Sequence, residues 1–217
     1  MSRPVLWFDF GGVLSPPLPD LFTLFEQKTG ITPEQMHAAL SRMGDDFGTA
    51  ALAPIELGAM SEREWAARLA AALAALHPDL DLSRLRTDGF GAQWFEGVSA
   101  NPRMTAALCR ARDLGLGVGV LSNNVVEWKP YWTAIIAPAG RVDNVVDSCE
   151  VGVRKPDPEI FRLAEKAAGV PPEDCILIDD LAENCAAAEE CGWSAVRFRD
   201  DDQILRELSA LAGVHLS

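Results

Sequence analysis

Polar residues stand where three apolar segments of this sequence end and before one helical pattern, and their types suit phosphate or carboxylate chemistry. The run "VLWFD" ends in an acid, "LGVGVL" is followed by a hydroxyl and two amides, "CILI" is followed by two acids, and a lysine precedes a helical pattern in "VRKPDPEIF". These residues are Asp9, Ser122, Asn123, Asn124, Lys155, Asp179 and Asp180. Brought together, they would supply three carboxylates, a hydroxyl with turn amides, and one ammonium group.

Three neighbouring carboxylates repel one another and raise each other's pKa values. A divalent, oxygen-preferring cation such as Mg²⁺ relieves that repulsion. With a cation in place, Asp9 could act as a carboxylate nucleophile, while Ser122, turn amides and Lys155 would hold the non-reacting oxygens. Taken singly, each residue could equally be a turn or a helix cap. The four elements together, in this order, favour a functional site.

The elements that would position these residues alternate between helix and strand. Strand patterns at 5–9, 116–121, 175–179 and 194–198 are separated by helical patterns at 102–114, 158–168 and 181–191, and a last helix is expected near 202–211. Such alternation predicts right-handed crossovers and a parallel sheet covered on both faces. We therefore expect a doubly wound, Rossmann-like α/β fold, with ligands bound at the carboxyl ends of the strands.

A second region, rich in helical patterns, interrupts this alternation after the first strand. Helices are expected over 18–30, over 33–44 and over 62–76, with Gly44 ending the second of them. Proline-containing segments at 15–19 and 99–102 flank the region and resemble hinges. We expect an α/β core formed by residues 1–15 and 99–217, with residues 16–98 as an all-helical cap that closes over the cleft.

The composition is that of a soluble globular protein and excludes several classes of partner. The chain has 217 residues, 48% of them hydrophobic, and a formal net charge of -13. Because no basic stripe offsets phosphate repulsion, nucleic-acid binding is not expected, and no apolar run is long enough to span a membrane. The five cysteines show no CxxC pair, which favours a reducing, cytoplasmic location. Either a monomer or a homodimer is compatible with the sequence.

The order "FDFGGVL … LSNN … RKPDPEIF … IDDLAEN" resembles the haloacid dehalogenase (HAD)-like hydrolase superfamily. It is similar in particular to phosphatases with a helical cap inserted after the first strand, which act on small phosphorylated metabolites with Mg²⁺. The resemblance implies that Asp9 forms an aspartyl-phosphate. By the same resemblance, phosphate would be bound by Ser122, Asn123, Lys155 and Gly12. Mg²⁺ would be ligated by Asp9, Asp180 and the Gly11 carbonyl, with Asp179 acting through a water molecule. Asn184 would support Lys155 or the acids.

The sequence departs from this pattern at Gly11. Phosphatases of the superfamily usually carry a second aspartate there, which protonates the leaving group and then activates water. Acid–base assistance of this kind contributes about 10²–10⁴-fold to a rate, so its loss favours leaving groups that need little protonation, such as those of acyl phosphates or sugar 1-phosphates. Alternatively, an acid of the cap would supply the proton; the candidates are Glu26, Asp45, Asp46 and Glu56.

Two other readings remain open. A 2-haloacid dehalogenase also uses an aspartate nucleophile, needs no metal and lacks the second aspartate; against it, Asp179 and Asp180 would lie beside Asp9 without a cation. A binding or regulatory protein could retain the fold without turnover, but such a protein would not need to keep Asp9, Ser122 or Lys155.

Overall fold

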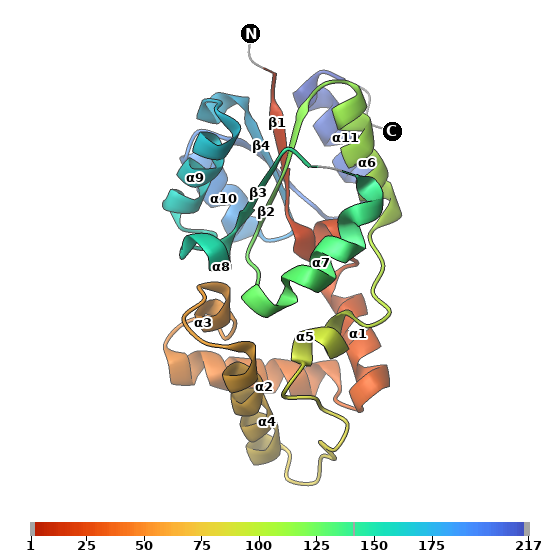
Figure 1. Ribbon diagram of the computed structural model, residues 1–217, viewed down its shortest axis with the longest axis vertical. Helices are drawn as coiled ribbons and strands as arrows, with labels where there is room; N and C mark the ends of the chain where they lie inside the picture. Colours follow the sequence, from red (N-terminus) through yellow and green to blue (C-terminus); the bar gives the residue numbers. More distant parts are fainter. Residues whose placement is uncertain (1–2, 141, 215–217) are drawn as a thin grey trace.

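The computed structural model of the protein describes residues 3–140 and 142–214. A parallel sheet forms its centre, in the strand order β3-β2-β1-β4-β5. The strands are β1 (Val5–Phe8), β2 (Gly117–Ser122), β3 (Asn144–Asp147), β4 (Cys175–Asp179) and β5 (Ser194–Arg197). The chain builds outward from β1 to β3 and then returns to the other side of β1 (Figure 1). The predicted doubly wound α/β fold is therefore confirmed, and its strand order reverses between β1 and β4, where ligands commonly bind.

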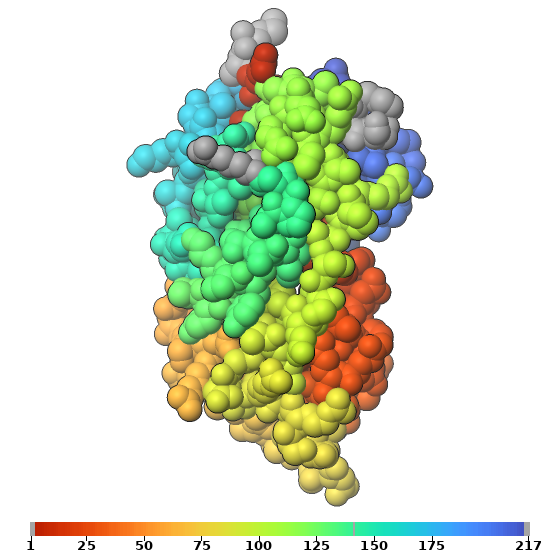
Figure 2. Space-filling model, turned by 45° about the vertical axis from the view of Figure 1, so that its right-hand side comes forward, coloured from red at the N-terminus to blue at the C-terminus, as the bar shows by residue number. Residues whose placement is uncertain are grey.

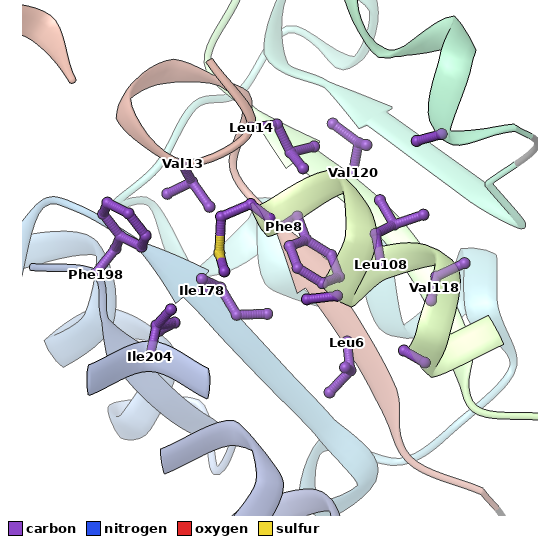
Figure 3. Close-up of a cluster of buried hydrophobic side chains, with 14 of the residues drawn as sticks. Leu6, Phe8, Val13, Leu14, Leu108, Val118, Val120, Ile178, Phe198 and Ile204 are labelled. Atoms are coloured by element: carbon purple, nitrogen blue, oxygen red, sulfur yellow. The ribbon is translucent and has the colours of Figure 1, made fainter. Parts of the chain in front are cut away.

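Helices cover both faces of this sheet (Figure 1). One face carries α6 (Pro102–Asp113), α7 (Lys129–Ile136) and α11 (Asp201–Ala212), and the other carries α9 (Pro158–Ala168) and α10 (Ala182–Glu190); the short α8 (Ser148–Val151) follows β3. Successive side chains of a strand point to opposite faces of its sheet, so alternate residues of β1 pack on the two faces. Leu6 and Phe8 pack under α6 and α11, as Figure 3 shows, whereas Val5 and Trp7 pack against α9. Both clusters fix the strand that leads to Asp9.

A second group of helices packs at the carboxyl end of the sheet, and we call it the helical layer (residues 18–95). Its helices are α1 (Leu18–Thr29), α2 (Pro33–Phe47), α3 (Ala53–Glu56), α4 (Glu62–Leu76) and α5 (Phe90–Phe95). They enclose a hydrophobic cluster of their own, separate from the two clusters of the sheet. Figure 2 shows the helical layer, red to yellow, lying against the green surface around α7, which α5 contacts.

The two chain segments that enter and leave the helical layer run side by side. The backbone N–H of Asn101 donates to the carbonyl of Leu14 at 2.8 Å. The Asn101 side chain then caps α6 by accepting from the N–H groups of Arg103 and Met104. The two crossings are thus tied together beside the carboxyl end of β1.

One local expectation was wrong, and several elements of the structure were not expected. Helix α2 runs past Gly44 to Phe47 and ends at Gly48, which has a φ of 66°. Gly44 instead allows a close approach, since a Cβ there would lie 3.1 Å from the carbonyl oxygen of Thr49. Strand β3 and helix α7 were not expected; β3 has the sequence NVVD, in which two valines stand between polar residues, so no apolar run marks it as a strand.

The turn after β1 depends on one of its two glycines. Residues Phe10–Leu14 form a single irregular helical turn, in which Gly12 has a φ of 73°. A Cβ at Gly12 would also lie 2.6 Å from Oδ2 of Asp180. Gly11, in contrast, has a φ of -67°, and its nearest neighbour would be Oδ2 of Asp9 at 3.9 Å. Backbone and packing therefore require glycine at position 12 but not at position 11.

These neighbouring glycines should respond differently to alanine. Gly12→Ala places a side chain in the left-handed region and against Asp180, so we expect a loss of about 1–3 kcal/mol in the free energy of unfolding. Gly11→Ala, the matched control, should stay within about 1 kcal/mol of the unchanged protein. Urea unfolding of both variants measures the difference, and equal losses would show that the turn does not have this geometry.

Candidate active site

Asp9 lies at the carboxyl edge of the sheet, one residue beyond β1. Its backbone N–H donates to the carbonyl of Ile178 at 2.8 Å, which continues the pairing with β4. The backbone is extended there, and the residue is 8% exposed. Burial raises the pKa of Asp9 to about 7, with Asp179 and Asp180 adding to the shift and Lys155 opposing it. The carboxylate is therefore costly to ionise without a further positive charge nearby.

The Lys155 ammonium is the buried cation of this site. Nζ lies 2.5 Å from Oδ2 of Asp179, 3.1 Å from Oδ1 of Asp9 and 2.8 Å from the carbonyl oxygen of Leu121. Burial disfavours the charged form, but Asp179 and Asp9 outweigh it and raise the pKa of Lys155. The ammonium thus stays charged and holds two carboxylates, from β4 and the end of β1, against the end of β2.

Asn123 fixes the backbone of this lysine. Its side-chain oxygen accepts from the N–H of Lys155 at 2.8 Å, and its side-chain nitrogen donates to the Lys155 carbonyl at 2.9 Å. Ser122, the last residue of β2, is 2% exposed and pairs in register with Asp147 of β3. The loop after β2 therefore places the Ser122 hydroxyl and the lysine at one edge of the sheet.

Asp179 is held from several directions at once. Besides Lys155, its carboxylate accepts from the N–H of Leu181 and from the side-chain nitrogen of Asn184, both at 2.9 Å. Asn184, which stands in α10, thus supports an acid; the sequence had left open whether it would support Lys155 instead. With both oxygens of Asp179 already engaged, this carboxylate has little capacity left for a direct ligand.

The three acids are close enough to share a cation. Carboxylate oxygens of Asp9, Asp179 and Asp180 lie within 4.8 Å of one another. Burial and Asp179 raise the pKa of Asp180, so three acidic groups face the single ammonium of Lys155. A divalent, oxygen-preferring ion fits this donor set, because it would neutralise charge that Lys155 alone leaves uncompensated. Asp9 and Asp180 are the two carboxylates with oxygens available for it.

The resemblance implied that Gly12 binds phosphate, but its backbone N–H already has a partner within the protein. Its N–H donates to Oγ of Ser15 at 3.0 Å. For this amide to bind phosphate, that bond would have to break. Gly12 contributes close approach to Asp180 instead, as its geometry shows.

A cavity of about 410 Å³ opens in front of Asp9, between the sheet and the helical layer. Among its lining residues are Asp9, Gly11, Ser122, Asn123, Lys155, Asp180 and Asn184. Of the four acids considered as proton donors, Glu56 lines this cavity, whereas Glu26, Asp45 and Asp46 are not among its lining residues. The structure thus brings Glu56 to the cleft that holds the predicted nucleophile.

Glu56 joins the two parts of the molecule across this cavity. Its Oε2 lies 2.7 Å from Nε of Arg154, the residue before Lys155. Its carbonyl oxygen accepts from Oγ of Ser148 at 2.6 Å. Burial raises the pKa of Glu56, and Arg154 opposes that shift. Sequence reasoning missed Arg154, although its place beside Lys155 in "VRKPDP" was a usable signal.

The ionisation of Asp9 should make stability depend on pH. The folded protein holds the Asp9 proton up to about pH 7, while the unfolded chain releases it near 3.8. The folded state therefore binds more protons in this interval, and its stability falls as pH rises through it. In metal-free buffer, we expect the stability of Asp9→Asn relative to the unchanged protein to increase by about 2–4 kcal/mol from pH 4 to pH 7.

Urea unfolding at several pH values measures this difference, and Asp113→Asn serves as the control. Asp113 is an exposed acid at the end of α6 that does not line the cavity. Added Mg²⁺ should reduce the Asp9 effect at pH 7, because it would favour the ionised carboxylate. A stability difference that stays flat from pH 4 to pH 7 would contradict the proposed electrostatics.

Comparison with known proteins identifies relatives by sequence. The chain is 33% identical over 115 residues to mouse acyl-CoA dehydrogenase family member 10, a match that covers 53% of this chain and 11% of that protein. It is 30% identical over 148 residues to a phosphatase of Mycobacterium tuberculosis, covering 65% of this chain and 68% of the other. The chain thus spans about a tenth of the length of the mouse relative.

Solved structures share the fold over nearly the whole chain. A HAD family enzyme of Bacteroides thetaiotaomicron, in complex with magnesium and inorganic phosphate, has 19% identity and a TM-score of 0.62, covering 91% of this chain and 95% of that one. The L-2-haloacid dehalogenase of Xanthobacter autotrophicus has 17% identity and a TM-score of 0.66, covering 96% and 83%. At these identities the likeness concerns the fold alone.

In the part of the chain that the structure describes, no helix is both long and apolar enough to cross a membrane. The model of haloacid dehalogenase-like hydrolases matches residues 5–192, which include every strand end described above except that of β5. The chain belongs to the haloacid dehalogenase-like hydrolase family.

Proposed function

We propose that this protein is a Mg²⁺-dependent phosphatase of a small phosphorylated metabolite, with Asp9 as the nucleophile. The observation that carries the proposal is the charge arrangement at the strand ends. Asp9 and Asp179 pair with one buried ammonium, and the carboxylate oxygens of Asp9, Asp179 and Asp180 are spaced for a cation. The phosphatase named among the relatives supports the same reaction class.

Asp9, Asp180 and the Gly11 carbonyl would hold the ion, with Asp179 acting through a water molecule. When bound, Mg²⁺ supplies positive charge that lets Asp9 ionise and offsets the charge of a phosphoryl group. The engaged oxygens of Asp179 agree with an indirect role.

The reaction then divides into two displacements at phosphorus. Asp9 attacks, the bond to the leaving oxygen breaks, and an aspartyl-phosphate forms on its carboxylate. Water next attacks the phosphorus, which releases inorganic phosphate and restores Asp9. The Ser122 hydroxyl and the Asn123 N–H would hold the phosphoryl oxygens, and Lys155 would steady both Asp9 and the phosphoryl group.

In this scheme the leaving group must gain a proton and the attacking water must lose one. Gly11 can carry neither proton, whereas the usual aspartate would carry both. The cavity beside Gly11 is open, and Glu56 is the acid of the helical layer that lines it. We propose that turnover is fastest on phosphorylated compounds whose leaving groups need little protonation, such as acyl phosphates. The helical layer would exclude water from the cleft during the transfer.

Replacing Asp9 tests the nucleophile. Asp9→Asn keeps the shape of the side chain but removes the attacking charge, so we expect Mg²⁺-dependent phosphate release from acetyl phosphate or p-nitrophenyl phosphate to fall by about 10³-fold or more. The control Asp147→Asn, which changes a buried acid at the end of β3, two strands away from β1, should retain activity within a few-fold. Activity that survives in Asp9→Asn would exclude Asp9 as the nucleophile.

Restoring an acid at position 11 tests the missing proton carrier. The backbone at Gly11 suits any residue, and a Cβ there meets only an ordinary contact with Asp9. Gly11→Asp should therefore fold and raise kcat on alkyl phosphates by about 10-fold to 10²-fold, with a smaller gain on acyl phosphates. Gly11→Asn controls for size and polarity without the proton. A gain that is equal for both variants, or equal for both leaving groups, would show that protonation at this position does not limit the rate.

A dehalogenase is the second candidate, because glycine at position 11 leaves Asp9 without a neighbouring acid–base group, as the sequence had suggested. In that reaction Asp9 would displace halide from carbon. Halide release from 2-chloropropionate that is unchanged by a chelator would favour this candidate. Neither halide nor phosphate release from a folded sample would favour a binding or regulatory role.

A further inference from the structure

The cavity in front of Asp9 is polar at one end and apolar at the other. Residues from the sheet side supply its charged and amide groups, including Asp9, Lys155 and Asp180. The helical layer supplies almost entirely hydrocarbon, including Leu18, Leu21, Phe22, Met36, Leu40 and Trp94. Among the described residues of the helical layer that line the cavity, Glu56 is the only charged one. A phosphoryl group at Asp9 would therefore direct its leaving group toward an apolar wall.

Aromatic rings form a continuous part of this wall. Phe22 meets Trp94 edge-on, with ring centroids 5.5 Å apart. Trp94 stacks on Phe90, and Phe90 stacks on Trp128, each with centroids 6.0 Å apart. Trp128 then meets Phe95 at 5.7 Å. Rings from α1, α5 and the loop after β2 thus line one side of the cleft without interruption.

The position of this wall is fixed by specific contacts. The indole N–H of Trp128 donates to Oε2 of Glu62 at 2.8 Å. A Cβ at Gly91 would lie 2.3 Å from the Trp128 ring, so glycine at this position of α5 permits the stacking. A wall held in this way does not need to be ordered when a ligand binds, which favours binding.

The few polar side-chain groups on the apolar side are those of Glu56, Trp65 and Trp94, and two of them have partners. Glu56 pairs with Arg154, and the indole N–H of Trp65 donates to the carbonyl of Ala51 at 2.7 Å. A leaving group rich in hydroxyls would have to leave water without finding equivalent partners here, which costs free energy. A hydrocarbon leaving group has no such cost and gains from burial.

We propose that the substrates of this site carry phosphate on a leaving group that is mainly hydrocarbon, such as a long-chain acyl phosphate, rather than on a sugar. The inference rests on the proposed phosphatase activity for the reaction, but its evidence is the shape and lining of the cavity. The phosphate would sit at Asp9 and Lys155, and the hydrocarbon would lie along Phe22, Trp94 and Leu18. A single cavity then accounts for both reaction and specificity.

Binding of alkylphosphonates tests this inference without requiring turnover. In saturating Mg²⁺, calorimetry across methyl- to octylphosphonate should show Kd falling about three- to fourfold for each added methylene until the chain fills the cavity. Propylphosphonate should bind at least about fivefold more tightly than 2,3-dihydroxypropylphosphonate, which differs only by two hydroxyls. A Kd that is constant along the series, or tighter binding of the dihydroxy compound, would overturn the inference.

Two leucines of similar exposure, one lining the cavity and one outside it, test where the hydrocarbon chain binds. Leu18 lines the cavity and is 40% exposed, while Leu76 on α4 is 42% exposed and does not line it. We expect Leu18→Gln to weaken octylphosphonate about fivefold and to leave methylphosphonate unchanged, whereas Leu76→Gln changes neither. Equal effects of both variants, or equal effects on both phosphonates, would contradict the proposed position of the hydrocarbon.

The two proposals can fail separately. Chain-length-dependent binding without phosphate release from any ester would contradict the phosphatase proposal and support the apolar specificity. Phosphate release together with a flat phosphonate series would contradict the apolar specificity alone.

Discussion

The buried ammonium of Lys155 is the interaction on which this site depends. It joins the ends of three strands, because its partners are Asp9 after β1, Leu121 in β2 and Asp179 in β4. Asn123 binds both backbone groups of the same lysine. Removing one member would leave another buried charge uncompensated, which is more costly than never having buried it. The fold and the chemistry therefore share one network.

The negative charges of this network outnumber its positive charges. Three acids lie close together and only two of them pair with the ammonium, so the site favours a further cation, and burial raises the pKa of Asp9 to about 7 in its absence. The uncompensated negative charge at the strand ends links the sheet to the proposed reaction. A divalent ion would release Asp9 to act as a nucleophile, while Asp179 stays engaged with Lys155, Leu181 and Asn184.

The sequence was informative about the residues that stand at strand ends. The position of a residue directly after a buried strand determines which edge of a parallel sheet it occupies, so Asp9, Ser122, Asp179 and Asp180 could be placed together in advance. What could not be predicted depends on contacts between distant elements. The pair of Glu56 with Arg154 spans the helical layer and the core, and no local pattern shows which side chains of α1, α2 and α5 face the cleft. Strand β3 escaped prediction because its two valines stand between polar residues and form no apolar run.

Trapping the covalent intermediate tests the central claim, that Asp9 attacks phosphorus. Because Gly11 provides no base for the second displacement, the aspartyl-phosphate should persist long enough to be captured. After a single turnover of acetyl phosphate with Mg²⁺, acid quenching and peptide mass spectrometry should find a phosphoryl group on Asp9. Inorganic phosphate release with no phosphoryl group on Asp9 at any quench time would contradict the account.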